Sequence, residues 1–330
     1  MQLRIAKLIF IGSLLTLAAC SGEAVFESPP ISQFQHTDET VESAAVSSDG
    51  QLSVVSEHGK VCVWDNTNNT LIFECITGDD ANYVELVGLS DDKTTFYISN
   101  RMAIHVFSVQ TGQLIGSWST GQNIARDIAI SADGHLLLVG YRTGEADVIN
   151  TQTKHNTVFK IHRLDINSVA LSADGGTALS GSSDKHAYLW STANGKILQE
   201  YKLATRVNHV SMNEQGSIGF AIDSVDDRIF LDLKSGEELA ELNIFANFIE
   251  FNDSQFINND KWFLTGSPKS KIYLWQVASG NLLAEYGAAE KGQRSSILAV
   301  GFDEATQRIF THNSNGTLEV WPYQSQSKKD

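Results

Sequence analysis

Apolar and polar residues alternate along most of this chain in short runs that are separated by polar turns. Within residues 162–203, the apolar side chains Ile166, Val169 and Leu171 belong to one such run, which ends at the turn Asp174-Gly175. Alternation with a period of two is typical of a strand with one buried face. The pattern therefore predicts four short antiparallel strands in this segment, over residues 166–171, 177–181, 186–190 and 197–201.

The polar turn after the first strand recurs seven times along the chain. Its fourth position is occupied in turn by Asp49, Asp92, Asp133, Asp174, Gln215, Ser254 and Ala305. Successive copies lie 43, 41, 41, 41, 39 and 51 residues apart. A period of 40–45 residues is typical of the four-stranded blade of a propeller. We therefore predict an all-β fold, a seven-bladed β-propeller over residues 31–323, followed by a polar C-terminal tail at 324–330.

The two ends of this repeat region complement each other. The seventh copy stops after a third strand, at Trp321-Pro322-Tyr323, whereas residues 31–36 precede the first copy and have the form of a fourth strand. Pairing of these two segments would close the ring and remove exposed sheet edges, which otherwise promote aggregation. The N-terminal strand is therefore expected to complete the last blade.

The sixth copy has unusual spacing. From Ser254 to the third-strand aromatic residue Trp275 there are 21 residues, against 15 or 16 in other copies. This predicts an insertion at residues 256–261, between the first and second strands, and a long connector follows at 287–296. Such insertions lie in loops and sometimes mark a binding face, but they are also tolerated as neutral variation on a surface.

The repeats resemble those of the WD40 family. The third-strand aromatic position reads Trp64, Phe107, Ile149, Trp190, Leu231, Trp275 and Trp321, and Trp64-Asp65 is the dipeptide that names the family. The fourth copy carries the full polar set of the family, His162, Ser180, Asp184 and Trp190. The resemblance implies that these four side chains hydrogen-bond in series inside the blade. The seventh copy keeps a partial set (Thr311, Asn315, Trp321), and the other blades are expected to rely on apolar packing.

The N-terminus has the form of an export signal. Residues 1–19 contain Arg4 and Lys7, then an apolar run at 8–17 that is shorter than the roughly 20 residues of a membrane-spanning helix. The ending Leu17-Ala18-Ala19-Cys20 resembles the lipobox of bacterial lipoproteins, and an ordinary secretory signal is the alternative. The resemblance implies cleavage before Cys20, acylation of Cys20 (palmitate among its acyl chains) and a lipidated tether at residues 20–30. By the same resemblance, Ser21 at the position after the cysteine implies the periplasmic face of the outer membrane, with the inner membrane and the cell surface as alternatives.

Charge limits the class of partner. Without residues 1–19, 22 basic residues face 39 acidic ones, a net charge of −17. Such a charge repels phosphate backbones and anionic head groups. Nucleic acid is therefore not an expected partner, and contact with the membrane is expected through the lipid alone.

Two cysteines are expected to lie close together in the first blade. Cys62 belongs to the predicted third strand and Cys75 to the fourth, with a turn at residues 66–70 between them. Opposed residues in an antiparallel hairpin come close enough for a disulfide, and an oxidising compartment allows one. The alternative is a pair of buried thiols, because free cysteine packs as a small apolar side chain.

No catalytic motif occurs in the sequence. It lacks Cys-x-x-Cys, His-Glu-x-x-His, Gly-x-Ser-x-Gly and a phosphate-binding glycine loop, and its nine histidines are scattered. We therefore expect no enzyme, no cofactor and no metal. The alternative is an enzymatic or ligand-binding propeller whose metal or small-molecule site is built in the central channel from several blades.

The resemblance implies that partners bind the narrow face, where the first strands begin. The candidate residues there are Tyr83, Arg126, Asp165, Arg206 and Phe245. Exposed aromatic and arginine side chains are enriched in binding hot spots, although each of these is also an ordinary loop residue type. The sequence thus favours a non-catalytic scaffold or assembly factor that binds envelope proteins and is otherwise monomeric.

Overall fold

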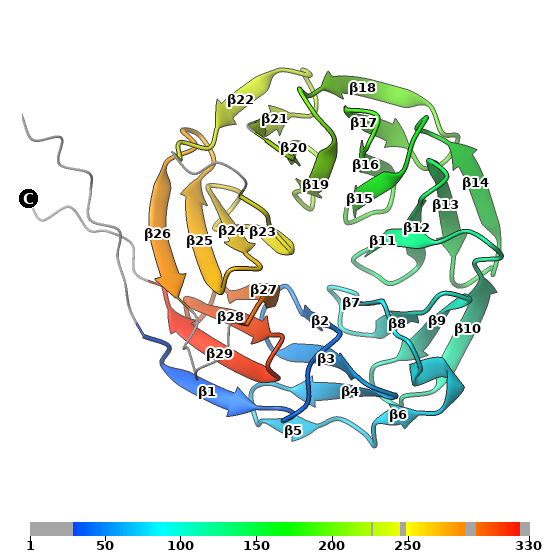
Figure 1. Ribbon diagram of the computed structural model, residues 1–330, viewed down its shortest axis with the longest axis vertical. Helices are drawn as coiled ribbons and strands as arrows, with labels where there is room; N and C mark the ends of the chain where they lie inside the picture. Colours follow the sequence, from blue (N-terminus) through cyan, green and yellow to red (C-terminus); the bar gives the residue numbers. More distant parts are fainter. Residues whose placement is uncertain (1–28, 226, 245–248, 288–294, 324–330) are drawn as a thin grey trace, which may run out of the picture.

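The protein is a ring of seven antiparallel sheets arranged around a central axis (Figure 1). The computed structural model describes residues 29–323 except 226, 245–248 and 288–294. The first strand of each blade lies nearest the axis and the last strand lies at the rim. The prediction of an all-β, seven-bladed propeller is confirmed.

The first three blades comprise β2 (Ser43–Val46), β3 (Leu52–Glu57), β4 (Lys60–Asp65), β5 (Thr70–Leu71) and β6 (Ile76–Thr77); β7 (Leu86–Leu89), β8 (Thr95–Ser99), β9 (Ala103–Ser108) and β10 (Leu114–Ser119); and β11 (Ala125–Ile130), β12 (Leu136–Tyr141), β13 (Glu145–Asn150) and β14 (Asn156–Lys160). A short 3-10 helix, η1 (Asp79–Ala81), lies between the first and second blades.

Blades four to seven comprise β15 (Ile166–Leu171), β16 (Thr177–Ser182), β17 (His186–Ser191) and β18 (Ile197–Lys202); β19 (Val207–Met212), β20 (Ile218–Asp223), β21 (Arg228–Asp232) and β22 (Glu238–Glu241); β23 (Asp253–Ile257), β24 (Trp262–Gly266), β25 (Lys271–Gln276) and β26 (Leu282–Gly287); and β27 (Ile297–Asp303), β28 (Arg308–Asn313), β29 (Thr317–Pro322) and β1 (Ser32–Gln35).

The N-terminal strand completes the seventh blade, as predicted. Strand β1 pairs antiparallel with β29, from Ser32 opposite Val320 to Gln35 opposite Thr317. The Gln33 side chain donates a hydrogen bond to Glu319, 2.8 Å away, which adds a side-chain contact to the ladder. The two ends of the described chain therefore meet in one sheet.

A local hydrogen-bond pattern explains why the same turn recurs. In the fourth blade, Ser172 donates from Oγ to Asp174, 2.7 Å away, and its Oγ accepts the amide of Thr177. Gly175 follows with φ +70°, and a Cβ there would lie 2.4 Å from Leu136 of the third blade. Serine, aspartate and glycine thus each have a separate task in the turn. The same Ser–Asp bond forms in the first three blades at Ser47–Asp49, Ser90–Asp92 and Ser131–Asp133.

The predicted insertion between the first and second strands of the sixth blade is wrong. Strand β23 begins at Asp253, so Ser254 lies inside the strand, and the turn falls at residues 258–261. Asn259 holds the fourth turn position there, 44 residues after Gln215 and 16 before Trp275. The error arose because Phe251-Asn252-Asp253 copies the form of a turn at the start of a strand. The additional residues belong to the connector 242–252, whereas comparable connectors such as 203–206 have four or five residues.

Six clusters of buried apolar side chains occur in the described part of the chain, and each spans two neighbouring blades. In three of these junctions a glycine of the second strand lets the next blade approach closely. A Cβ on Gly140, Gly181 or Gly266 would lie 2.5–2.6 Å from an Ile or Val methyl group of the next blade. None of the six clusters spans the seventh and first blades, where His312 holds the position of those glycines.

Candidate functional site

The narrow face is formed by the connectors into the first strands and by the turns between second and third strands. Tyr83 lies on this face just before β7, with 76% of its side-chain surface exposed and φ +57°. Beside it, Met102 in the turn between β8 and β9 is also 76% exposed. Together with Asp79, Asn82, Asn100 and Arg101 they line a hollow of about 520 Å³. Tyr83 was expected there from the sequence; Met102 was missed, although its position in that turn places it on the same face.

Arg126 and Arg206 come together at the narrow-face mouth of the central channel. Both side chains are exposed, and both line a cavity of about 260 Å³ that also includes Asn167 and Asn208. The Nε of Arg206 donates to Ser224 Oγ, 2.7 Å away, so a neighbouring turn orients this guanidinium. These two arginines form the channel-mouth pair.

The remaining narrow-face candidates lie elsewhere. Asp165 faces Arg142, with 3.5 Å between the Arg142 Nε and a carboxylate oxygen, and it does not line the cavity of the channel-mouth pair. Tyr83 lines a separate hollow. Phe245 lies outside the described residues, and so does Cys20 with the predicted leader and most of the predicted tether. The sequence predicted that the candidate residues share one face. In the structure, Tyr83 lines one hollow and the channel-mouth pair lines another.

The polar set of the fourth blade forms a connected series of hydrogen bonds. His162 Nδ1 lies 3.2 Å from both carboxylate oxygens of Asp184, and its Nε2 lies 2.8 Å from Ser180 Oγ. Trp190 Nε1 donates to the same Oγ at 3.1 Å. Burial by itself would raise the pKa of Asp184, but bonds from His162 and from the amide of Arg163 hold it well below its usual range. This series links the connector before β15 to β16, to β17 and to the turn between them.

Partial versions of the series occur in the sixth and seventh blades. Trp321 Nε1 donates to Thr311 Oγ1, and Trp275 Nε1 donates to Thr265 Oγ1, each at 3.1 Å. The expectation that the sixth blade has lost this feature is therefore wrong. Its turn had been placed five residues too early, at Ser254 and not at Asn259, which hid the equivalence of Thr265 to Ser180.

The cysteine pair lies in the first blade as a disulfide. Cys62 in β4 is bonded to Cys75, which lies just before β6. The outer strand of this blade is divided into β5 and β6, and both parts pair with β4. The disulfide connects the interrupted outer edge to the third strand close to the break.

Two carboxylates lie deep in the channel and bind neighbouring blades. Asp127 accepts the amide of Val169, and Asp253 accepts the amide of Val300, each at 2.8 Å. Burial raises the pKa of Asp127, and it raises the pKa of Asp253 to about 6. The channel histidine His209 lies 2.7 Å from Ser254 Oγ, and burial lowers its pKa to about 4. These groups are held by protein partners, and within the described residues no three His, Cys, Asp or Glu side chains come together as a metal site.

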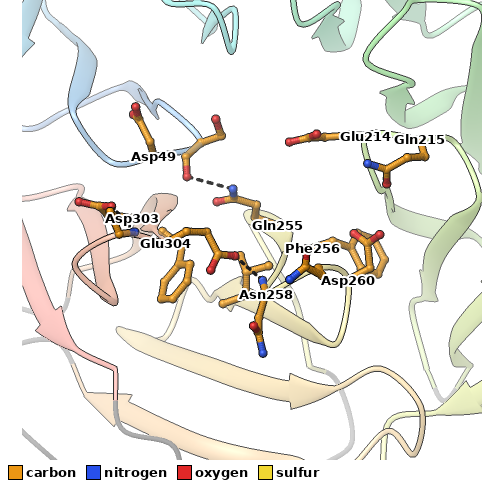
Figure 2. Close-up of a pocket in the computed structure, with 14 residues that line it drawn as sticks. Asp49, Glu214, Gln215, Gln255, Phe256, Asn258, Asp260, Asp303 and Glu304 are labelled. Carbon is orange, nitrogen blue, oxygen red and sulfur yellow. Dashed lines mark hydrogen bonds between the residues drawn. The ribbon is translucent and has the colours of Figure 1, made fainter.

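The opposite mouth of the channel is an acidic hollow of about 520 Å³, shown in Figure 2. It is lined by turns between first and second strands, with Phe256 and Phe302 among its apolar residues. Gln255 donates to the Ser48 carbonyl, and the Asn258 amide donates to Glu304, as the dashed lines show. Its carboxylates are Asp49, Glu214, Asp260, Asp303 and Glu304. This hollow was not predicted from the sequence, because it forms only where turns from four blades converge.

Two segments, residues 28–65 and 153–191, match the family model described as "WD domain, G-beta repeat". The first and fourth repeats are therefore similar to the WD40 repeat. They include the Trp64-Asp65 dipeptide and the complete polar set of the fourth blade up to Trp190, so the family signal is recognised where those residues are kept. The chain is thus similar to WD40 proteins in these two repeats, and its other blades keep the propeller geometry with fewer of the marker residues.

Two eukaryotic proteins are similar to this chain over part of their own length. Autophagy-related protein 16 of Arabidopsis thaliana is 23% identical over 278 residues, which cover 82% of this chain and 53% of that protein. Pre-mRNA-processing factor 19 of Caenorhabditis elegans is 28% identical over 189 residues, 54% of this chain and 36% of that protein. The chain thus spans about half or less of the length of these WD40 relatives, and both are eukaryotic.

Among solved structures, a chain in the crystal structure of the mitotic checkpoint complex has a TM-score of 0.75 to this protein at 14% identity. The match covers 98% of this chain and 100% of that one. At this identity the likeness supports the fold alone. In the described part of the chain, no helix is both long enough and apolar enough to cross a bilayer.

Proposed function

We propose that this protein is a non-catalytic interaction scaffold that binds a protein partner through its narrow face. The observation that carries the proposal is the pair Tyr83 and Met102, which are both 76% exposed beside a hollow of about 520 Å³. Large exposed apolar side chains around a hollow are typical of protein-binding sites. WD40-type relatives support a scaffold role over a catalytic one.

The proposed location is the periplasmic face of the outer membrane, with the propeller held there by lipid on Cys20. Support comes from the sequence at residues 17–20 and from Ser21. Two or more acyl chains give stable anchoring, which a single chain does not. The partner would then be an envelope protein, and the scaffold would be monomeric apart from that partner.

The test is in-cell cross-linking with a tagged copy of the full chain, followed by identification of the captured proteins. The variants are wild type, Tyr83→Ala with Met102→Ala, and Cys20→Ala. A matched control is Val158→Ala, since Val158 is a 52% exposed apolar residue of the outer strand β14. We expect one defined envelope protein with wild type and with Val158→Ala, and its loss with the Tyr83/Met102 variant.

Either of two results would count against the proposal. Equal capture by the Tyr83/Met102 variant would reject this face as the binding site. Turnover of a small molecule by purified wild type, without capture of any protein, would reject the scaffold role. Release of the Cys20→Ala protein from the membrane fraction is the expected result for the anchor.

A further inference from the structure

The channel-mouth pair differs from the other arginines of the narrow face by its lack of acidic partners. Arg101 Nε lies 2.8 Å from Glu85, and Arg142 Nε lies 3.5 Å from Asp165. Within the described residues, neither Arg126 nor Arg206 forms an ion pair. In the described part of the chain, these two cationic groups thus lack an ion-pair partner, in a protein whose formal net charge is −15.

The surroundings hold the channel-mouth pair in place and supply polar and apolar contacts. Ser224 Oγ, which accepts from Arg206 Nε, lies 3.1 Å from the side-chain oxygen of Asn208. Asn167 is fixed as well, because its amide donates to the Val207 carbonyl at 2.8 Å. Ile222 and Phe251 contribute apolar walls to the same cavity.

The opposite end of the channel has the reverse charge. Glu214 lines both the acidic hollow and the channel cavity next to it, and burial together with the charges of Asp91 and Asp260 raises its pKa. The narrow-face mouth has one carboxylate among its lining residues, the exposed Glu250. The two mouths therefore select for ligands of opposite charge.

Resting on the scaffold function proposed above, we propose that the channel-mouth pair binds an acidic segment of the protein partner, with Arg126 and Arg206 engaging its carboxylate groups. Arginine presents a planar fork of donors that matches a carboxylate. The cavity of about 260 Å³ lies below the roughly 300–1,000 Å³ of small-molecule sites, so it accommodates an inserted side chain of a larger partner.

An acidic protein segment fits this site better than a nucleic acid does. Proteins that bind duplex DNA typically neutralise about 6–10 phosphates, which two free arginines cannot do. The net charge of −15 would also repel a long polyanion, whereas a short cluster of Asp or Glu carries few charges to the mouth.

The first experiment measures binding of a fluorescein-labelled peptide with four consecutive glutamates to the purified full chain by fluorescence anisotropy. Arg126→Ala with Arg206→Ala is compared with wild type and with Arg101→Ala plus Arg142→Ala. The second pair removes the same charge from the same face but from arginines that have acidic partners. We expect about tenfold or more weaker binding for each arginine removed from the channel-mouth pair, and less than about threefold for the control pair.

A lysine version sharpens the test. Arg126→Lys with Arg206→Lys keeps the charge and loses the fork, so its affinity is expected to lie between those of wild type and the alanine pair. Equal losses in the channel-mouth and control pairs would overturn the proposal, since net charge alone would then explain binding. No binding of the peptide by wild type, or tighter binding of a single-stranded oligonucleotide, would also overturn it.

The cross-linking experiment distinguishes failure of the acidic-segment proposal from failure of the scaffold function. Loss of the cross-linked partner in the Arg126/Arg206 variant, with retention in the control pair, supports the acidic segment. Retention in the Arg126/Arg206 variant, with loss in the Tyr83/Met102 variant, rejects the acidic segment and leaves the scaffold function standing. Circular dichroism of each variant verifies that the propeller is folded.

Discussion

Two junctions between blades of this ring are built in opposite ways. The junction of the fifth and sixth blades, the aromatic seam, is a buried cluster that includes Phe220, Phe230, Phe251, Phe263 and Trp275. The junction of the seventh and first blades, the closing seam, contains His36, His312, Asn313, Glu57 and Trp64. The first junction is packed with large aromatic side chains, whereas the second also buries several polar side chains.

The closing seam carries an unusual histidine contact. His312 Nε2 lies 3.2 Å from His36 Nδ1, and the His36 ring stacks on Trp64 with 4.3 Å between ring centroids. Burial lowers the pKa of His36 to about 4 and that of His312 to about 3, the latter assisted by the neighbouring His36. Among the described residues, the other ring nitrogen of each histidine and the side-chain amide of Asn313 have no hydrogen-bond partner. Unpaired buried polar atoms reduce stability, so the ring is expected to be weakest at this junction.

We expect the largest effect from a substitution within the aromatic seam. Trp275→Ala removes a fully buried side chain and its bond to Thr265, and should lower the free energy of unfolding by about 3–5 kcal/mol. Trp64→Ala, its counterpart on the closing seam, should cost about 1–2 kcal/mol because Trp64 is only half-buried. Chemical denaturation followed by circular dichroism measures both, and equal losses would contradict the comparison.

Removal of the disulfide should have the next largest effect. Cys62→Ser with Cys75→Ser opens a link across 13 residues of sequence, which corresponds to about 3 kcal/mol in the chain-entropy account. Hydrogen exchange should then rise in β5 and β6 more than in the sixth blade. Thiol titration of the unfolded, unreduced protein provides the check, because reactive thiols at both Cys62 and Cys75 would show that the link does not form in the protein.

Acid should weaken the closing seam selectively. The unfolded chain binds protons on histidine at a pKa of about 6.5, whereas the folded chain binds them on His36 only near 4. Stability from neutral burial is therefore present above pH 6.5 and is lost as the pH falls toward 4.

The matched variant for this test is His312→Gln, which keeps a polar side chain without the titration. Its unfolding free energy should depend less steeply on pH between 6.5 and 4, by about 2 kcal/mol over that interval. His209 and Asp253, with pKa values of about 4 and 6, are present in both proteins and cancel in the difference. Identical pH profiles would show that the histidine pair does not control the seam.

The smallest effect is expected from converting the closing seam into an apolar one. His36→Phe with His312→Leu replaces both members of the pair, and such replacements are nearly neutral or stabilising when the shape is kept. We expect the free energy of unfolding at neutral pH to change by no more than about 1 kcal/mol. It should also fall less steeply with decreasing pH than that of the wild type. A loss above about 3 kcal/mol would mean that the histidines contribute stability that their geometry does not reveal.

The seven-bladed ring could be predicted from the sequence, but the packing between neighbouring blades could not. Serine, aspartate and glycine in the turns act locally, as at Ser172 and Asp174, so their spacing predicted the blades. In the sixth blade the local pattern misled, because Asn252-Asp253 resembles a turn but begins a strand. His312 could be compared with Gly181 only after the register of each blade was known.

The candidate site shows the same limit. Arg126 and Arg206 could each be placed on the narrow face by counting back from the turns, but they are 80 residues apart in sequence. They line one cavity only because the ring curves, and a local sequence pattern does not predict that curvature. That neither arginine forms an ion pair with another described residue likewise becomes visible only when contacts between blades are known.

The pairing of β1 with β29 has a consequence for biosynthesis. Ser32 meets Val320 across 288 residues of sequence, so the strand made first must wait for the strand made last. At roughly 5–20 residues per second, a ribosome needs about 15–60 seconds to make the intervening chain. Throughout that time the N-terminal strand has no partner of its own, and blades two to six can assemble as an open arc. Completion of the ring is therefore a late event that joins the strand of the propeller made first to the strand made last.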